Sequence, residues 1–121
     1  MSKSILVVDD NWVTRSTLQE ALEDEGYEVD TASDGLIAWK KLTLHLACYG
    51  VILLDLTMPR MGGLQLVEAF QAQEEPITRL VIAMSADCHA LQQAKALGIR
   101  HILPKPFDLE IALALIATCF D

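Results

Sequence analysis

The sequence predicts an α/β fold, a doubly wound parallel sheet of five strands in the order 2-1-3-4-5 with five helices. Short apolar runs alternate strictly with segments of helical periodicity along the chain, the pattern of consecutive strand and helix units joined by right-handed crossovers. A length of 121 residues suits a single domain, 1–121. Of the common doubly wound orders, 2-1-3-4-5 is the one that fits this length.

Five apolar runs are expected to form the strands. Residues 5–8 and 51–54 are wholly apolar, as strands buried on both faces of a parallel sheet should be. Residues 27–32 alternate between apolar and polar, which favours a strand nearer the sheet edge. The fourth and fifth strands are expected over residues 80–84 and 101–103.

Helical spacing of apolar residues predicts five helices, over residues 13–25, 35–46, 64–73, 88–97 and 109–119. Gly26 and Gly98 stand where the first and fourth helices should stop. Pro76 should end the region of the third helix. Asp108 is a suitable N-cap for the last helix, and Glu110 lies near its positive end.

The composition excludes several functional classes. With 17 acidic and 9 basic residues and a net charge of -8, the chain offers no direct nucleic-acid surface. No apolar stretch could span a bilayer and no signal-peptide region is present, so we expect a cytoplasmic protein without membrane contact. Cys48, Cys88 and Cys119 lack metal-site spacing and are expected to be reduced and mostly buried.

Charged residues stand at the ends of several predicted strands. Asp9 and Asp10 follow the first strand, Asp55 follows the third, and Lys105 comes just after the fifth. The carboxyl ends of parallel strands share one edge, and the crevice of this topology opens between strands one and three. Three carboxylates and one ammonium group would therefore converge, which indicates a magnesium and phosphate site.

Each of these residues also has a simpler interpretation. Asp9 and Asp10 could cap the first helix, and Asp55 could be a turn residue. Ser85, which directly follows the fourth predicted strand, could be an ordinary loop hydroxyl, and Lys105 could be a solvated surface charge. The occurrence of all of them at strand ends favours the functional interpretation.

Four segments give the chain a resemblance to a known family over essentially its whole length. They are VVDDN at 7–11, LLDLTMPRMGG at 53–63, AMSA at 83–86 and KPF at 105–107. On these segments the chain resembles the receiver domain of bacterial two-component response regulators, such as the chemotaxis regulators. The resemblance implies a flavodoxin-like receiver fold and a function as a phosphoacceptor switch.

The resemblance implies a Mg²⁺ site and a phosphorylation site. Asp9, Asp10 and Asp55 would bind Mg²⁺ together with the backbone carbonyl of Thr57, since this hard cation takes oxygen ligands. Asp55 would accept a phosphoryl group from a histidine kinase or a histidine phosphotransfer protein. Catalysis would be limited to this self-catalysed transfer and to slow autodephosphorylation, so the chain would not be an enzyme.

The resemblance gives Lys105 and Ser85 roles beside the phosphoryl group. Each would contact a phosphoryl oxygen, because phosphoryl transfer depends on positioning and on charge neutralisation. Inward movement of Ser85 after phosphorylation would be the switch. The family also implies a cis peptide bond between Lys105 and Pro106.

Ile102 departs from the family pattern, which usually has Tyr or Phe three residues before the lysine. Isoleucine cannot make the inward ring rotation of that aromatic residue, so the readout of the switch would be altered. A docking or dimerisation module that works without phosphorylation is therefore an alternative function. A haloacid-dehalogenase-like phosphatase is a third, but Thr57 stands where its second Asp should follow Asp55.

The last predicted helix carries no charge over residues 111–120. One apolar stripe is expected to pack on the sheet: Leu109, Leu113, Ile116 and Phe120. Ile111, Ala114 and Leu115 fall on other faces, which raises the hypothesis that a homodimer partner, an adjacent domain or a kinase covers them. The alternative is a helix that is buried more deeply than usual.

Overall fold

The computed structural model describes residues 4–58, 60–74 and 77–120. Within these residues there are five strands, five α-helices and two short 3-10 helices, η1 and η2. The elements in chain order are β1 (Ser4–Val8), α1 (Trp12–Asp24), β2 (Glu28–Ala32), α2 (Gly35–His45), η1 (Leu46–Cys48), β3 (Tyr49–Asp55), α3 (Gly63–Ala72), η2 (Thr78–Leu80), β4 (Val81–Ser85), α4 (Cys88–Ala96), β5 (His101–Pro104) and α5 (Leu109–Cys119).

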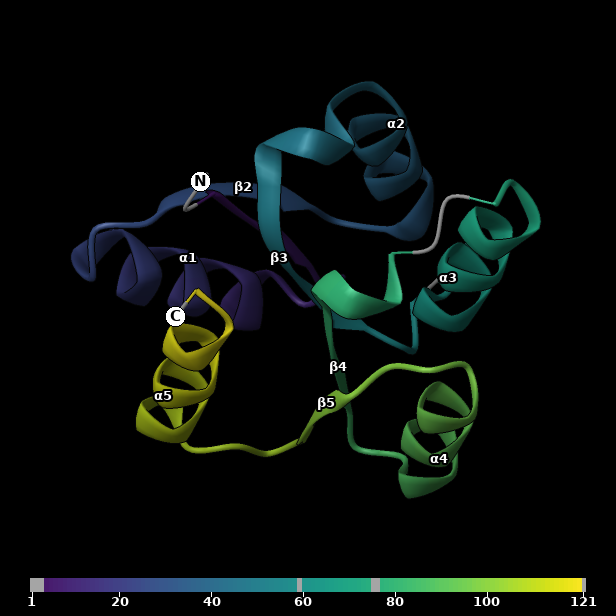
Figure 1. The fold of residues 1–121 in the computed structure, drawn as a ribbon. Helices are drawn as coiled ribbons and strands as arrows, with labels where there is room; N and C mark the ends of the chain where they lie inside the picture. The colour runs from purple at the N-terminus through teal and green to yellow at the C-terminus, as the bar shows by residue number, and fades with distance from the viewer. Residues whose placement is uncertain (1–3, 59, 75–76, 121) are drawn as a thin grey trace.

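The strands form one parallel sheet in the order β2-β1-β3-β4-β5, so the predicted topology is confirmed. Figure 1 shows α1 and α5 on one side of the sheet and α2, α3 and α4 on the other. Alternate residues of each central strand enter one of two cores, because successive side chains of a strand point to opposite faces. In β1, for example, Ile5 and Val7 face α1 and α5, whereas Leu6 and Val8 face α2, α3 and α4.

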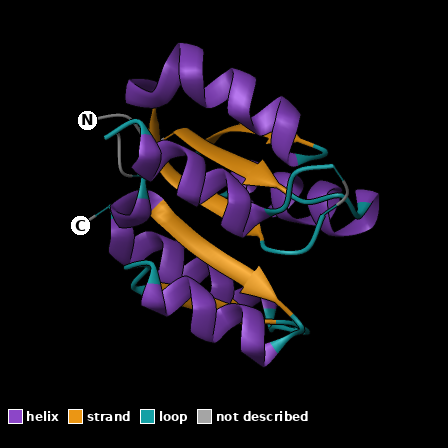
Figure 2. Ribbon diagram, turned by 90° about the vertical axis from the view of Figure 1, so that its right-hand side faces the viewer, coloured by secondary structure: helices purple, strands orange, loops and turns teal. Residues whose placement is uncertain are grey.

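The register of the strands sets the place of the polar residues that follow them. Val8 of β1 pairs with Leu54 of β3, so Asp9 and Asp55 come next to each other at the ends of neighbouring strands. Ser85 ends β4 and pairs with Pro104 of β5. In Figure 2 the strand arrows point toward the same side of the molecule. The carboxyl ends of β1, β3, β4 and β5 therefore meet at one edge.

Short polar side chains begin most of the helices. The side chains of Asn11, Asp34, Asp87 and Asp108 each accept a backbone N–H bond at the start of α1, α2, α4 and α5, as N-caps do. Gly26 and Gly98 have φ angles of +93° and +101°, a left-handed conformation that glycine adopts without steric cost. Both predicted helix stops, and the predicted cap at Asp108, are thus confirmed.

Several details differ from the expectations. Cys48 and Cys88 are exposed and only Cys119 is half-buried, so the prediction of mostly buried thiols is wrong. Leu115 is half-buried and packs on the core below α5, whereas Ile111 and Ala114 are exposed as expected. The helix is thus more deeply packed than its pattern indicated. Pro76 lies outside the described residues.

No helix within the described residues is both long and apolar enough to cross a membrane.

A network of polar side chains joins β2, β3 and α2. The hydroxyl of Tyr49 donates to Asp30 Oδ2 at 2.8 Å, and Lys41 Nζ donates to Asp30 Oδ1 and to the Thr31 carbonyl, each at 2.7 Å. Burial first, and then the neighbouring Asp30 carboxylate, raise the pKa of Tyr49 well above its usual range. The tyrosine therefore remains a neutral donor that holds β3 to β2 across β1.

Substitution of Tyr49 by Phe should lower the free energy of unfolding by about 1 kcal/mol. The ring still fills its buried position, but Asp30 Oδ2 loses the hydroxyl donor. Urea unfolding of the wild type, Tyr49→Phe, Asp30→Asn and the double variant gives the coupling between the two side chains. Purely additive effects in that cycle would contradict an energetic link between them.

Candidate functional site

Three carboxylates meet at the ends of β1 and β3. Asp9, Asp10 and Asp55 each place an oxygen atom within 4.8 Å of the others. Asp9 and Asp55 are buried, and Asp10 is exposed. The donors are all carboxylate oxygens, which suit a hard divalent cation such as Mg²⁺. The structure therefore brings together the three acidic residues that the sequence singled out.

Lys105 lies against two of these carboxylates. Its Nζ atom is 2.8 Å from Asp9 Oδ2, to which it donates a hydrogen bond, and 3.7 Å from Asp55 Oδ2. The peptide bond that follows, to Pro106, is cis. Only 22% of the lysine side chain is exposed, so the alternative of a solvated surface charge is wrong. Its backbone N–H donates to the Ser85 carbonyl at 2.8 Å, which fixes this loop to the end of β4.

Asp9 is held at every polar atom. Its N–H donates to the Ala32 carbonyl at 3.1 Å, and its Oδ1 accepts from the N–H of Asn11 at 2.9 Å. Arg15 Nη1 donates to its carbonyl at 2.7 Å. Asn11, and neither aspartate, caps α1 by accepting from the N–H groups of the following turn. The alternative that the aspartate pair serves as the helix cap is therefore wrong.

Asp55 has an unusual protonation equilibrium. Burial, followed by the repulsion of Asp9, raises its pKa from 3.8 to about 7, although the Thr57 N–H and the Lys105 ammonium act in the opposite direction. The N–H of Thr57 donates to Asp55 Oδ1 at 3.2 Å. The free protein therefore keeps the proton on Asp55 to a higher pH than an ordinary carboxyl group does, and a bound cation would favour the carboxylate form.

The other predicted residues lie on β4, on β5 and in the loop after β3. Ser85 is buried at the end of β4, and its Oγ accepts a hydrogen bond from the N–H of Asp87 at 2.9 Å. Thr57 is exposed in the loop that follows β3. Ile102 is half-buried on β5 beside Ala83 of β4. The simpler interpretation of Ser85 as an ordinary loop hydroxyl is therefore wrong. Ser85 is buried and ends β4, the strand that pairs with the strand of Asp55.

An ion pair that the sequence did not reveal fixes the loop after β3. Asp34 is buried at the start of α2 and pairs with Arg60. Arg60 itself has a φ angle of +67°, an uncommon conformation for a residue with a side chain. A Cβ atom on Gly35 would lie 2.1 Å from the carbonyl oxygen of Met61, so only glycine permits this approach. The loop that carries Thr57 is therefore fastened to the start of α2.

The arrangement can hold a divalent cation beside a nucleophilic carboxylate, with an ammonium group next to the same carboxylates. Asp55 has one oxygen near Lys105 and the other bonded to the Thr57 N–H. The cation and the ammonium group could together neutralise a group that carries negative oxygens at this position. Such a site suits phosphoryl transfer to a carboxylate.

Comparison with known proteins agrees with this geometry. The family model described as "Response regulator receiver domain" matches residues 5–117. The sporulation initiation phosphotransferase F of Bacillus subtilis is 30% identical over 110 residues, which cover 91% of this chain and 87% of that protein. The chain spans about half the length of several other relatives, which are response regulators or transcriptional regulatory proteins.

Solved structures show the same fold. The chemotaxis protein CheY4 of Vibrio cholerae matches with a TM-score of 0.84 and 31% identity, over 98% of this chain and 99% of that one. CheY in the CheX-CheY-BeF3-Mg complex of Borrelia burgdorferi matches with a TM-score of 0.83 and 27% identity, over 98% of this chain and 89% of that one. Both matches extend over all the strands that carry the acidic site.

Proposed function

The chain belongs to the response regulator receiver domain family, and from this membership we propose that it is a Mg²⁺-dependent phosphoacceptor switch phosphorylated on Asp55. One observation carries the proposal. The ammonium group of Lys105 lies 2.8 Å from Asp9 and 3.7 Å from Asp55, beside three carboxylates whose oxygens lie within 4.8 Å of one another. Support also comes from the related Borrelia burgdorferi CheY, whose complex contains BeF3 and Mg²⁺.

The residues present fit a magnesium ion. Asp9, Asp10 and Asp55 would hold it together with the backbone carbonyl of Thr57, a donor set made only of oxygen atoms. When bound, Mg²⁺ would neutralise the acidic cluster and an oxygen of the phosphoryl group. The hydrogen bonds to Asp9 from Asn11 and Arg15 would keep its carboxylate in place for this task.

The phosphoryl donor would be a histidine kinase or a histidine phosphotransfer protein. A carboxylate oxygen of Asp55 attacks the phosphorus of the donor phosphohistidine. The new O–P bond forms as the P–N bond breaks, and the imidazole nitrogen leaves with the electron pair of that bond. Lys105 and Ser85 would contact the phosphoryl oxygens from the ends of β5 and β4. Water would later hydrolyse the acyl phosphate slowly, in the same site and without another enzyme.

Incubation with acetyl phosphate and Mg²⁺ should add the mass of one phosphoryl group to the intact protein. EDTA should abolish the addition, because phosphoryl transfer at the acidic cluster would need the cation. The variant Asp55→Asn should also abolish it, because Asp55 would be the acceptor. Intact-mass spectrometry measures the result.

A second measurement covers the case in which a small phosphodonor does not react. Beryllofluoride should bind to the wild type in the presence of Mg²⁺ and not to Asp55→Asn, as monitored by the amide resonances of the loops after β3 and β4. Failure of both the mass addition and beryllofluoride binding would overturn the proposed function. It would leave a docking module that works without phosphorylation.

A further inference from the structure

Two contacts join the loop between β3 and α3 to the start of α2. Asp34, the N-cap of α2, pairs through its carboxylate with the guanidinium group of Arg60 in that loop. The Asp34 side chain is only 3% exposed, so its charge is held inside the protein. The next residue, Gly35, lies so close to the loop that a Cβ atom on it would come within 2.1 Å of the Met61 carbonyl oxygen. The start of α2 therefore limits where the loop can lie.

The same loop carries backbone groups that belong to the acidic site. The N–H of Thr57 donates to Asp55 Oδ1 at 3.2 Å, and the carbonyl of Thr57 is the backbone ligand proposed above for Mg²⁺. At the base of the loop, the N–H of Gly63 donates to the Leu56 carbonyl at 3.2 Å. Arg60 follows Thr57 by three positions. The place of its guanidinium group therefore constrains the backbone that carries the proposed ligand.

Arg60 has an uncommon backbone conformation where it meets Asp34. Its φ angle of +67° lies in the left-handed region, which residues with a Cβ atom seldom adopt. Such a conformation persists where the surrounding contacts determine it, and the ion pair with Asp34 is one such contact. The N–H of Ile37, and then Arg60, lower the pKa of Asp34 in spite of its burial. One permanent carboxylate thus binds both the first turn of α2 and the loop.

We infer that the ion pair between Asp34 and Arg60 positions the magnesium site, because it holds the loop after β3 where the Thr57 carbonyl reaches the cation. Asp34 and Arg60 are positioning residues, since neither belongs to the acidic cluster itself. Groups that orient metal ligands without touching the metal change its affinity by about 10–100-fold. The inference rests on the proposed function, because it needs the cation site.

Removal of the Arg60 charge distinguishes positioning from simple electrostatics. Loss of a positive charge near three carboxylates would strengthen Mg²⁺ binding if only charge mattered. If the ion pair positions the loop, Arg60→Met should instead weaken Mg²⁺ binding about tenfold in isothermal titration. Arg60→Lys keeps the charge and should retain part of the lost affinity. Arg79→Met, at an exposed residue of η2, is the matched control and should bind like the wild type.

Two outcomes of this titration separate the inference from the proposed function. If the wild type binds Mg²⁺ and Arg60→Met binds it equally or more tightly, the inference is overturned and the proposed function stands. If the wild type binds no Mg²⁺, both fail.

Gly35→Ala displaces the loop without a change of charge. The new Cβ atom would collide with the Met61 carbonyl group, so the loop must shift away from α2. We expect Mg²⁺ binding to weaken about tenfold here as well. Wild-type affinity in this variant would show that cation binding does not depend on the position of the loop, against the inference.

The variant Asp34→Asn removes the charge opposite Arg60 and keeps an oxygen for the Ile37 N–H, so α2 retains its cap. It should weaken Mg²⁺ binding about as much as Arg60→Met does. The double variant should be no weaker than either single variant, because the two side chains act as one unit. Additive losses would contradict a joint role of the pair.

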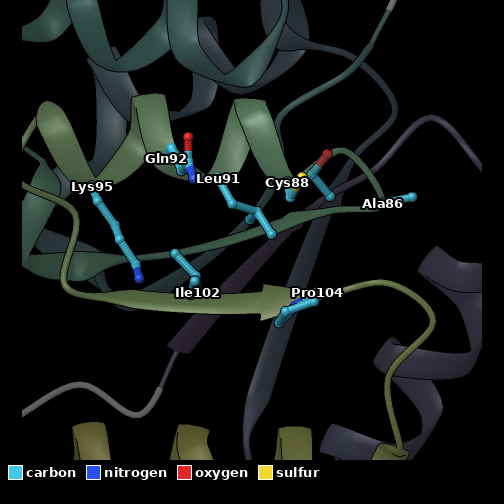
Figure 3. A pocket seen from close by; sticks show the side chains of 8 residues that line it. Ala86, Cys88, Leu91, Gln92, Lys95, Ile102 and Pro104 are labelled. Carbon is cyan, nitrogen blue, oxygen red and sulfur yellow. The ribbon is translucent and has the colours of Figure 1, made fainter.

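Hydrogen exchange in EDTA, followed by NMR, tests the loop in the absence of the cation. In Arg60→Met the N–H groups of Thr57 and Gly63 should exchange about tenfold faster than in the wild type. The N–H of Leu91 donates to the Asp87 carbonyl at 3.2 Å, the same distance as in the Gly63 bond, and serves as the control. Figure 3 shows Leu91 on α4 beside a pocket whose lining includes no residue of α2 or of the loop after β3. Its exchange rate should not change.

The pattern of exchange rates decides between a positioned loop and general damage. Faster exchange confined to the loop supports the inference. Equal acceleration at Leu91 would indicate a loss of global stability, and unchanged rates in the loop would show that the ion pair does not hold it. Either of these results would refute the inference.

Discussion

Replacement of Lys105 by methionine should slow phosphorylation of Asp55 by acetyl phosphate about 100-fold or more, and at the same time strengthen Mg²⁺ binding. Methionine keeps the bulk of the lysine stem and removes the ammonium group that faces Asp9 and Asp55. Loss of one preorganised charge contact to a transferring group costs about 10²–10³ in rate. The site would bind Mg²⁺ more tightly, because the Lys105 ammonium group would no longer compete with the ion for Asp9 Oδ2.

The two effects have opposite signs, which separates them from general damage to the site. Intact-mass time courses at saturating Mg²⁺ give the phosphorylation rate, and isothermal titration gives the affinity for the cation. Lys40→Met on the exposed face of α2 is the matched control and should behave like the wild type in both measurements. A variant that loses Mg²⁺ affinity together with its rate would show that Lys105 only supports the local structure.

Asp55→Asn should stabilise the Mg²⁺-free protein by about 2–4 kcal/mol at about pH 8, since one unit of pKa difference is worth about 1.4 kcal/mol. Burial and the repulsion of Asp9 raise the pKa of Asp55 from 3.8 to about 7 in the folded protein. The folded state thus favours the protonated carboxyl group. Its contribution to stability is fully present below pH 3.8 and is lost as the pH rises through about 7.

The pH dependence gives the sharper measurement. In EDTA, the free energy of unfolding of the wild type should contain a component that falls between about pH 4 and pH 7, and this component should be missing in Asp55→Asn. Urea unfolding at a series of pH values, with the difference between the two proteins plotted, isolates it from other titrating groups. Addition of Mg²⁺ should stabilise the wild type more than the variant. A difference that does not change with pH would contradict the raised pKa.

The sheet and the acidic cluster could be predicted because local patterns determine them. The alternation of apolar and helical segments fixed the class of fold, and parallel strands necessarily bring their carboxyl ends to one edge. Asp55 ends β3, and Asp9 and Lys105 directly follow β1 and β5, so their convergence required no knowledge of loop conformations. The pairing of Val8 with Leu54 then placed the two aspartates side by side.

Contacts that depend on loop conformation could not be predicted. The ion pair of Asp34 with Arg60 needs the positive φ of Arg60 and the close approach of Gly35 to Met61, none of which has a periodic signal. Arg15 reaches the Asp9 carbonyl from α1, one turn after the helix start, and its spacing alone could have suggested only an exposed charge. The turn dipeptide formed by Asp34 and Gly35 was the one available sign, since Asp before a helix is a common cap.

The exposure of individual side chains also could not be predicted from the pattern of apolar and polar residues. Cysteine is usually buried, but Cys88 is the first residue of α4 and Cys48 lies in a 3-10 turn, where helix ends meet solvent. Leu115 flanks the stripe of α5 that faces the sheet and still reaches the core, because a long side chain covers more of the surface than a helical projection assigns to it.

The ion pair between Lys105 and Asp9 joins residues 96 positions apart, and this separation has a consequence for biosynthesis. A chain that emerges from the ribosome from its N-terminus can bring β1 and β3 together long before β5 exists. During that interval Lys105 is absent, and the carboxylates of Asp9, Asp10 and Asp55 have no ammonium group beside them. Their mutual repulsion then opposes the pairing of β1 with β3 at the carboxyl ends of these strands. Early divalent cations would relieve the repulsion, so the nascent domain should depend on magnesium for its folding more strongly than the finished one.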